Sequence, residues 1–225
     1  MKPLLAEEQD GITLQDLGRA SLQIIHDIKN QLNGLKLYAT FLRKRMEKIE
    51  QAVEEQETVT KLIAGLDRAA SDLTVLVQYG RPLELQKQQG IDLQKLLRSV
   101  ASGLLGGGDS ADALVIDSDS LPLVGEFDPT ALTGALKAIA RGALKTQSRD
   151  NSTPIHVRLR QETIGEKATA IIEWQPVNFS TDDPFRSFNG SEAIRMSLAA
   201  KIIEAHGGSA EYQRDVLRIS LPLAE

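Results

Sequence analysis

The chain has 225 residues, which is enough for one large domain or two modest ones. Its 41% hydrophobic and 25% charged residues are ordinary for a soluble protein, while 4% aromatic residues are few for a protein that stacks bases or sugars. The net charge of −5 argues against a general nucleic-acid partner, and the lack of cysteine excludes disulfides, thiolate nucleophiles and thiolate zinc sites. His26, His156 and His206 are too widely spaced to form a His-rich metal motif.

The N-terminal sequence and the hydropathy pattern give no sign of membrane insertion. No apolar run approaches the roughly 20 residues that cross a bilayer. The N-terminus becomes acidic at Glu7 before a signal-type apolar region can develop. We therefore expect a cytoplasmic protein with no membrane partner.

Residues from about Thr13 to Tyr79 contain no proline and only three glycines, which is typical of long helices. Apolar residues recur there at steps of three or four, as in the seam of a coiled coil. The first seam consists of Leu22, Ile25, Ile28, Leu32, Leu35, Ala39, Leu42, Met46, Ile49 and Val53, and the second of Val59, Leu62, Leu66, Ala69, Leu73 and Leu76. We expect a turn in the polar stretch Glu54–Thr58 between them, and hence an antiparallel helical hairpin.

The apolar surface of this hairpin is wider than one partner helix can cover. Ile24, Ile63 and Val77 lie beside the two seams and broaden them. A second copy of the hairpin is the simplest cover, which predicts a homodimer with a four-helix bundle. The alternative is a monomeric hairpin that lies on the C-terminal domain.

Arg81-Pro82 ends the second helix because proline lacks the N–H that a helix interior needs. We therefore place the first domain at residues 1–82 and the second at 83–225. Helices are predicted at residues 91–103, 129–146 and 191–205, and strands at 113–116, 121–125, 155–161, 168–174, 210–213 and 216–221. Hairpin turns are expected at Gly165 and at Arg214-Asp215. The fold class is α+β: a helical hairpin followed by an α/β sandwich in which helices cover one face of a sheet.

The first helix carries a polar group that suits phosphoryl transfer. His26 follows the seam residue Ile25, so we expect it on the accessible flank of the bundle, with Asp27 adjacent and Asn30 one turn ahead. A neutral imidazole nitrogen can attack a phosphoryl group, a carboxylate can fix its tautomer, and an amide can orient a water. Such a pattern also occurs on solvated helix surfaces, so the spacing alone leaves both interpretations open.

The run from His26 to Leu32 (HDIKNQL) resembles the H-box of two-component sensor histidine kinases, with Gln31 where proline is common. Three further segments resemble the same family in the same order along the chain. They are Leu76–Pro82, Ile91–Leu97 and Ile202–Gly208, the last resembling the exit from a helix of the ATP-binding domain. The resemblance covers nearly the whole chain and implies a dimerisation bundle followed by an ATP-binding-type domain.

By this resemblance His26 is the phosphoaccepting histidine, and Asp27 is its general base and orienting carboxylate. Asn30 is then the residue that supports dephosphorylation of a partner's aspartyl phosphate. The accessible surface around His26 mixes polar and apolar side chains, as a transient docking surface does, although scattered surface apolar residues are also common. The predicted partner-binding residues are Lys29, Asn33, Leu37 and Phe41.

The other two histidines are not expected to be catalytic. His206 lies beside a Gly-Gly helix stop, which favours capping or packing near a helix C-terminus. His156 lies in a predicted strand without an acidic or metal-binding companion at a spacing of two, so we expect it at the surface.

The features that bind ATP in this family are missing. Ala138 and Gly142 occupy the two asparagine positions of the helix that holds magnesium. Gln175–Phe179 replaces the Asp-x-Gly-x-Gly turn, and Ala193 and Arg195 stand where a second glycine-rich turn is expected. A Cβ at those glycine positions blocks close approach of the backbone to phosphate.

These observations predict a histidine phosphotransferase that shuttles a phosphoryl group between the aspartates of response-regulator receiver domains. No cofactor is expected on this chain, and Mg²⁺ is expected on the partner receiver. One alternative is an ATP-dependent histidine kinase in which Lys137, Arg141 and Lys145 reach the phosphates. The other is a non-catalytic dimeric scaffold that binds a kinase or a receiver.

Overall fold

The computed structural model describes residues 25, 28–46, 53–105, 114–118, 122–147, 154–179, 183–187 and 191–224. The chain forms two compact units, Met1–Pro82 and Leu83–Glu225. No helix within these described ranges has the length and apolar character that crossing a membrane requires.

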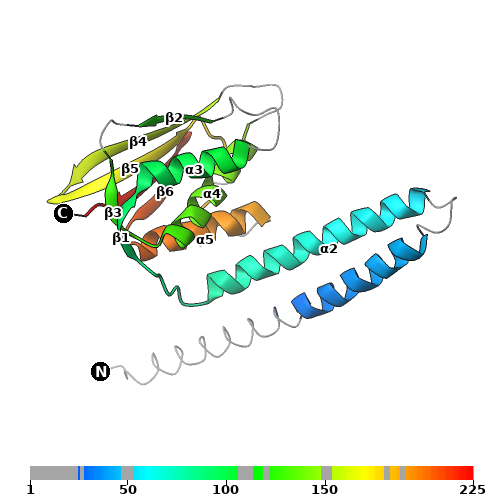
Figure 1. Ribbon diagram of the computed structural model, residues 1–225. Helices are drawn as coiled ribbons and strands as arrows, with labels where there is room; N and C mark the ends of the chain where they lie inside the picture. The colour runs from blue at the N-terminus through cyan, green and yellow to red at the C-terminus, as the bar shows by residue number, and fades with distance from the viewer. Residues whose placement is uncertain are drawn as a thin grey trace, which may run out of the picture. The chain divides into compact units, whose positions relative to one another are not determined.

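The described residues of the first unit form two helices that lie side by side (Figure 1). Residues 28–46 are helical, and α2 spans Val53–Gly80. The Lys36 ammonium pairs with the Asp67 carboxylate at 2.5 Å, and Gln56 Nε2 donates to the Met46 carbonyl at 3.1 Å. Rising residue numbers on one helix thus meet falling numbers on the other, which confirms the predicted antiparallel hairpin.

The position of the turn in this hairpin was predicted wrongly. Glu54–Thr58 is part of α2 and not a turn. Glu54 and Glu55 lie in the first turn of the helix, where carboxylates interact favourably with the positive end of the helix dipole. A polar stretch therefore starts the helix here, and residues 47–52 lie outside the described residues.

The second unit contains a five-stranded sheet with strand order β2-β4-β5-β7-β6. Its strands are β2 (Leu114–Ser118), β4 (Ile155–Ile164), β5 (Lys167–Gln175), β6 (Ser209–Gln213) and β7 (Val216–Pro222). β2 and β4 are parallel and the other neighbours are antiparallel. The hairpin turns fall where the sequence predicts them, with Gly165 (φ 65°) and Arg214 (φ 59°) in the left-handed region.

The described residues also contain a two-stranded antiparallel sheet of β1 (Gln88–Asp92) and β3 (Val124–Phe127). β1 was not predicted from the sequence, and the helix predicted at residues 91–103 begins two residues later than expected. That helix, α3 (Leu93–Leu105), begins after Asp92, whose carboxylate accepts from the N–H of Gln94 at 2.9 Å and of Lys95 at 3.4 Å. A capping aspartate thus marks the true helix start.

Three helices, α3, α4 (Pro129–Lys145) and α5 (Ser191–Ala205), lie on one face of the five-stranded sheet (Figure 1). Residues alternate along β4, where Ile155, Val157 and Leu159 are buried while His156 and Arg158 are exposed. The buried set packs against the helices and the exposed set forms the opposite sheet face. The α+β sandwich predicted from the sequence is therefore present.

Candidate functional site

The predicted catalytic residues are only partly visible. His26 and Asp27 lie outside the described residues, and Asn30 lies on the helix of residues 28–46. The surface around Asn30 therefore defines the described part of the candidate site.

Asn30, Asn33, Leu37 and Phe41 form one exposed stripe, hereafter the outer stripe, along that helix. At about 100° per residue they lie opposite Ala39, which is buried toward α2. The side chains of Leu37 and Phe41 remain 57% and 63% exposed. In sequence, His26 precedes Asn30 by four residues, the spacing of neighbours on one helix face.

Lys29 differs from the other predicted docking residues. Its side chain is half-buried, and the helical period places it about a quarter turn away from the outer stripe. Among the predicted partner-binding residues, Asn33, Leu37 and Phe41 thus share the stripe with Asn30, while Lys29 flanks it.

The same helix has a second exposed apolar stripe, hereafter the lateral stripe. Ile28, Leu35 and Leu42 recur every seven residues and are 41%, 54% and 54% exposed, and Tyr38 beside them is 69% exposed. A heptad row of large, half-exposed apolar side chains has the spacing of a helix-packing seam.

The helices that hold magnesium and nucleotide in the resembled family pack directly against each other here. Gly142 of α4 faces Met196 of α5, and a Cβ added to Gly142 would lie 2.6 Å from Met196 Sδ. Met196 is itself buried. An asparagine at position 142 would therefore collide with α5 in this arrangement.

The chain after β5 is bound to the protein's own backbone and side chains. The Val177 N–H donates to the Asp215 carbonyl at 2.9 Å, and the Phe179 N–H donates to Tyr212 Oη at 3.2 Å. The Phe179 and Tyr212 rings also pack edge to face, and Trp174 and Val177 are buried in the core. The backbone N–H groups of Val177 and Phe179 are thus used within the protein.

The start of α5 is also engaged. Glu192 pairs with Lys145 of α4, so a carboxylate stands at the helix N-terminus where a phosphate would otherwise be attracted. Ser197 Oγ donates to the Ser187 carbonyl at 2.8 Å, and Phe185 is buried. Together these contacts hold residues 183–187 against α5.

His206 has the structural role that the sequence predicts. Its buried ring accepts the Asp128 N–H at Nε2 over 3.0 Å, so the proton is on Nδ1, which donates to the Ile202 carbonyl at 2.8 Å. Burial, with a further contribution from the charge of Lys87, lowers the pKa of His206 below its ordinary value. His156 is exposed, as expected.

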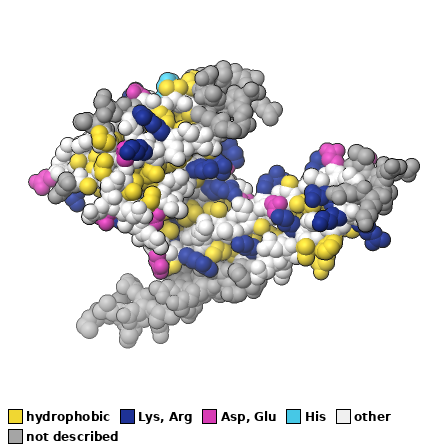
Figure 2. Space-filling model, viewed as in Figure 1, with side chains coloured by type: hydrophobic (Ala, Val, Ile, Leu, Met, Phe, Trp, Pro, Cys, Tyr) yellow, Lys and Arg dark blue, Asp and Glu magenta, His cyan; other side chains and the backbone are white. Residues whose placement is uncertain are grey.

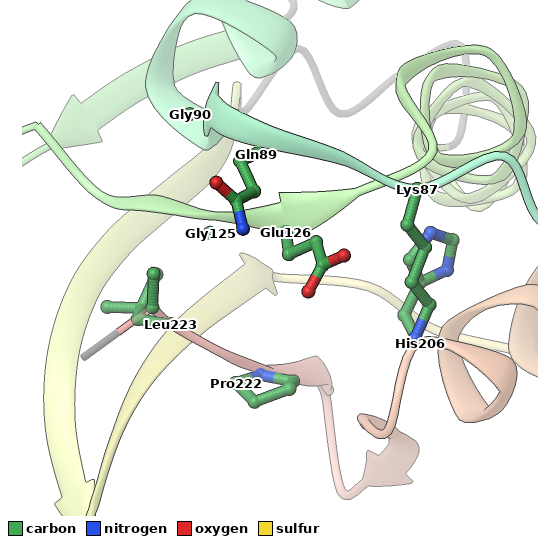
Figure 3. A pocket seen from close by; sticks show the side chains of 9 residues that line it. Lys87, Gln89, Gly90, Gly125, Glu126, His206, Pro222 and Leu223 are labelled. Atoms are coloured by element: carbon green, nitrogen blue, oxygen red, sulfur yellow. The ribbon is translucent and has the colours of Figure 1, made fainter.

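His206 also borders a cavity of about 580 Å³ between the β1–β3 sheet and the end of β7 (Figure 3). The side chains of Lys87, Gln89 and Glu126 line it, and Pro222 closes one side. This cavity lies away from the α4–α5 contact and combines opposite charges. No cluster of three or more potential metal ligands occurs among the described residues.

Two buried side chains at these positions were not predicted from the sequence. Met196 and Trp174 fill space near α4 and at the end of β5, and only their positions in the fold reveal this. The available signal was the apolar Met196 beside a turn that needs glycine in the resembled family.

No protein-family model and no curated protein matches the chain. Solved structures do match: full-length ShkA in complex with AMPPNP aligns with a TM-score of 0.65 at 19% identity, over 91% of this chain and 46% of that one. The Acinetobacter baumannii histidine kinase AdeS aligns with a TM-score of 0.57 at 15% identity, over 87% of this chain and 97% of that one. The chain spans just under half the length of ShkA. At these identities the similarity establishes a histidine-kinase-like fold.

Proposed function

We propose that this protein is a histidine phosphotransferase of a two-component phosphorelay, with His26 as the residue that carries the phosphoryl group. The observation that carries the proposal is the close contact of Gly142 with Met196. It supports a domain that retains the kinase fold without space for a nucleotide between α4 and α5. A phosphoacceptor histidine would then depend on other proteins for its phosphate.

The chemistry is a reversible transfer between histidine and aspartate. A neutral ring nitrogen of His26 attacks phosphorus, an N–P bond forms, and the P–O bond to the receiver aspartate breaks to release a carboxylate. Asp27 orients the imidazole and stabilises its positive charge during transfer. A second receiver aspartate takes the phosphoryl group by the reverse steps, and Mg²⁺ held by receiver carboxylates neutralises the phosphate charge.

The two exposed stripes of the first helix support separate contacts in this proposal. The lateral stripe pairs with the hairpin of a second copy to form a four-helix bundle, since heptad spacing suits helix packing. The outer stripe, with Leu37 and Phe41 beside Asn30 and Asn33, docks the receiver transiently.

The test starts from a receiver domain phosphorylated with acetyl phosphate. The wild-type protein is expected to take the phosphoryl group from the receiver and to carry it in an acid-labile bond. His26→Ala is expected to leave the receiver phosphorylated. Asn30→Ala is expected to keep transfer and slow hydrolysis. Equal loss of both reactions in Asn30→Ala would contradict its assigned role.

A non-catalytic scaffold is the first competing function. It predicts that His26→Ala supports normal output of the pathway while loss of dimerisation abolishes it. Loss of phosphoryl transfer in a His26→Ala dimer of normal stability would exclude the scaffold.

An ATP-dependent kinase is the second competing function, and the fold favours it because ShkA with the same fold was solved with AMPPNP. Lys137 and Arg141, both without a charged partner in the described residues, could attract phosphates. Label on His26 after incubation with γ-labelled ATP and Mg²⁺ would establish the kinase and overturn our proposal.

A further inference from the structure

Positive charge is concentrated on two neighbouring helices of the second unit. α3 carries Lys95 and Arg98, α4 carries Lys137, Arg141 and Lys145, and neither helix contains an Asp or Glu. The whole chain, by contrast, has a net charge of −5. These five residues are hereafter the basic helical face.

The basic side chains point away from the core. The buried residues of α4 lie on one side of the helix, and Arg141 lies about half a turn from their centre, with Lys137 and Lys145 one turn away on either side. Lys95, Arg98, Arg141 and Lys145 are exposed and Lys137 is half-buried. Figure 2 shows Lys and Arg side chains gathered on the helical side of the second unit.

Much of this charge is not neutralised. Lys145 pairs with Glu192, and Lys95 lies 3.8 Å from Asp92. Arg98, Lys137 and Arg141 have no hydrogen bond or ion pair within the described part of the chain.

The exposed face of the five-stranded sheet is organised in the opposite way. Cross-strand neighbours alternate in sign there: Asp117 faces Arg158, Arg158 faces Glu173, Glu173 faces Arg218 and Arg218 faces Glu211. Arginines on the sheet therefore have carboxylates as direct neighbours. On α3 and α4, by contrast, no carboxylate lies on the same helix to offset Arg98, Lys137 and Arg141.

Small residues keep the basic helical face accessible. Gly134 and Ala138 lie beside Lys137 and Arg141 on α4, and a Cβ on Gly134 would touch nothing within 4 Å. A partner surface can thus approach the guanidinium and ammonium groups closely, with no large side chain between them.

We infer that the basic helical face is a docking surface for a carboxylate-rich protein surface, and that the partner is the receiver domain. This inference rests on the proposed function. A receiver needs several carboxylates to accept phosphate and hold Mg²⁺, so it presents concentrated negative charge. Complementary charge accelerates encounter in a salt-dependent way.

A long polyanion fits less well. The phosphates of DNA or an anionic lipid surface extend far beyond two helices and would meet the remaining, net negative surface of the chain. A compact acidic patch on a protein can meet the basic helical face alone.

The test compares Arg141→Glu with Lys167→Glu, which changes the net charge equally at the exposed start of β5. The second-order rate of phosphoryl transfer from a phosphorylated receiver is measured at 50 and 300 mM NaCl. Arg141→Glu is expected to lower this rate about tenfold at low salt and less at high salt. The second-order transfer rate of Lys167→Glu should stay within about twofold of the wild-type rate. In both variants the transfer rate at saturating receiver and the unfolding midpoint should not change.

The outcomes separate the two proposals. If wild type transfers phosphate and Arg141→Glu behaves like Lys167→Glu, the docking surface is wrong and the proposed function stands. If no receiver domain of the source organism transfers its phosphoryl group to the wild-type protein, both the docking surface and the proposed function are overturned. If Arg141→Glu weakens binding to a DNA duplex or to phosphatidylserine vesicles but leaves transfer unchanged, the face binds polyanions and the receiver inference is overturned.

Discussion

Asp128 and His206 connect three parts of the second unit through a few buried atoms. The Asp128 carboxylate accepts the N–H groups of Thr130 and Ala131 at the start of α4 and of Gln86 in the preceding segment, at 2.9–3.0 Å. These bonds, with that from Ala131 the strongest, lower the pKa of Asp128. Its own N–H is held by His206 at the end of α5. The C-terminus of one helix and the N-terminus of another are thus fixed to each other.

The lowered pKa of His206 predicts a pH dependence of stability. The unfolded chain takes up a proton near the ordinary pKa of 6.5, whereas the folded protein takes it up only at lower pH. The free energy of unfolding should therefore fall as pH decreases below about 6.5 and level off below the folded pKa. Urea unfolding between pH 7.5 and 5 measures this fall.

His206→Gln provides the reference for that measurement. It removes the titrating group, while His26 and His156 are present in both proteins. The variant is expected to be less stable at pH 7.5 and to lose less stability on acidification. Parallel curves for the two proteins would show that His206 does not control this pH range.

At the scale of the helices, two glycines of α4 make opposite predictions. Gly134→Ala meets nothing within 4 Å and should stabilise the protein by about 1 kcal/mol, the difference in helix propensity. Gly142→Ala places a Cβ 2.6 Å from Met196 Sδ, so overpacking of about 1–3 kcal/mol should offset that gain. Urea unfolding of both variants checks the contrast.

A double-substitution cycle tests whether the contact with Met196 causes the predicted cost of Gly142→Ala. Met196→Ala alone should destabilise the protein by about 2–5 kcal/mol because it leaves a cavity. Gly142→Ala in the Met196→Ala background should be tolerated better than in wild type, with a coupling of at least about 0.5 kcal/mol. Additive effects would mean that α5 does not occupy the space beside Gly142.

Leu35 and Leu37 test whether the two stripes of the first helix act separately. Their side chains are 54% and 57% exposed, so a charge costs each a similar amount in the isolated hairpin. Leu35→Glu should dissociate the dimer, since the lateral stripe is then charged. Leu37→Glu should leave the dimer intact in sedimentation equilibrium and slow phosphoryl transfer at least about tenfold. Dissociation by both variants, or by neither, would contradict this division.

Most helices and strands could be predicted because the period of apolar residues in the sequence agrees with the burial of these residues in the structure. β4 alternates strictly and α5 ends at a Gly-Gly stop, so its bounds, Ser191–Ala205, were predicted correctly. β1 has few apolar residues and depends on pairing with β3, more than 30 positions away, which no local pattern reveals. The contact between Gly142 and Met196 could not be predicted for the same reason. No local pattern marks either residue, and they meet only because α4 packs on α5.

For the whole molecule, fold and chemistry have to be considered separately. The sheet order and the helical layer belong to a histidine-kinase-like fold, and the similarity to AdeS extends over 87% of the chain. Yet Met196 fills the space between α4 and α5 beside Gly142, and the chain after β5 bonds to β6 and to the β6–β7 turn. A fold of this class does not by itself confer ATP hydrolysis or phosphoryl transfer from ATP.

Nucleotide binding by the intact protein is therefore the decisive global property. A nucleotide at 100 times its dissociation constant would stabilise the native state by about 2.7 kcal/mol and raise the unfolding temperature. We expect no shift with millimolar ATP or ADP, with or without Mg²⁺, because the buried Met196 fills the space beside Gly142, where the resembled family has an asparagine that holds magnesium. A shift that requires Mg²⁺ would instead place a working nucleotide site in this domain. Met196→Gly supplies a control for steric exclusion: if closure of the α4–α5 contact is the main barrier, this variant should bind nucleotide more tightly than wild type.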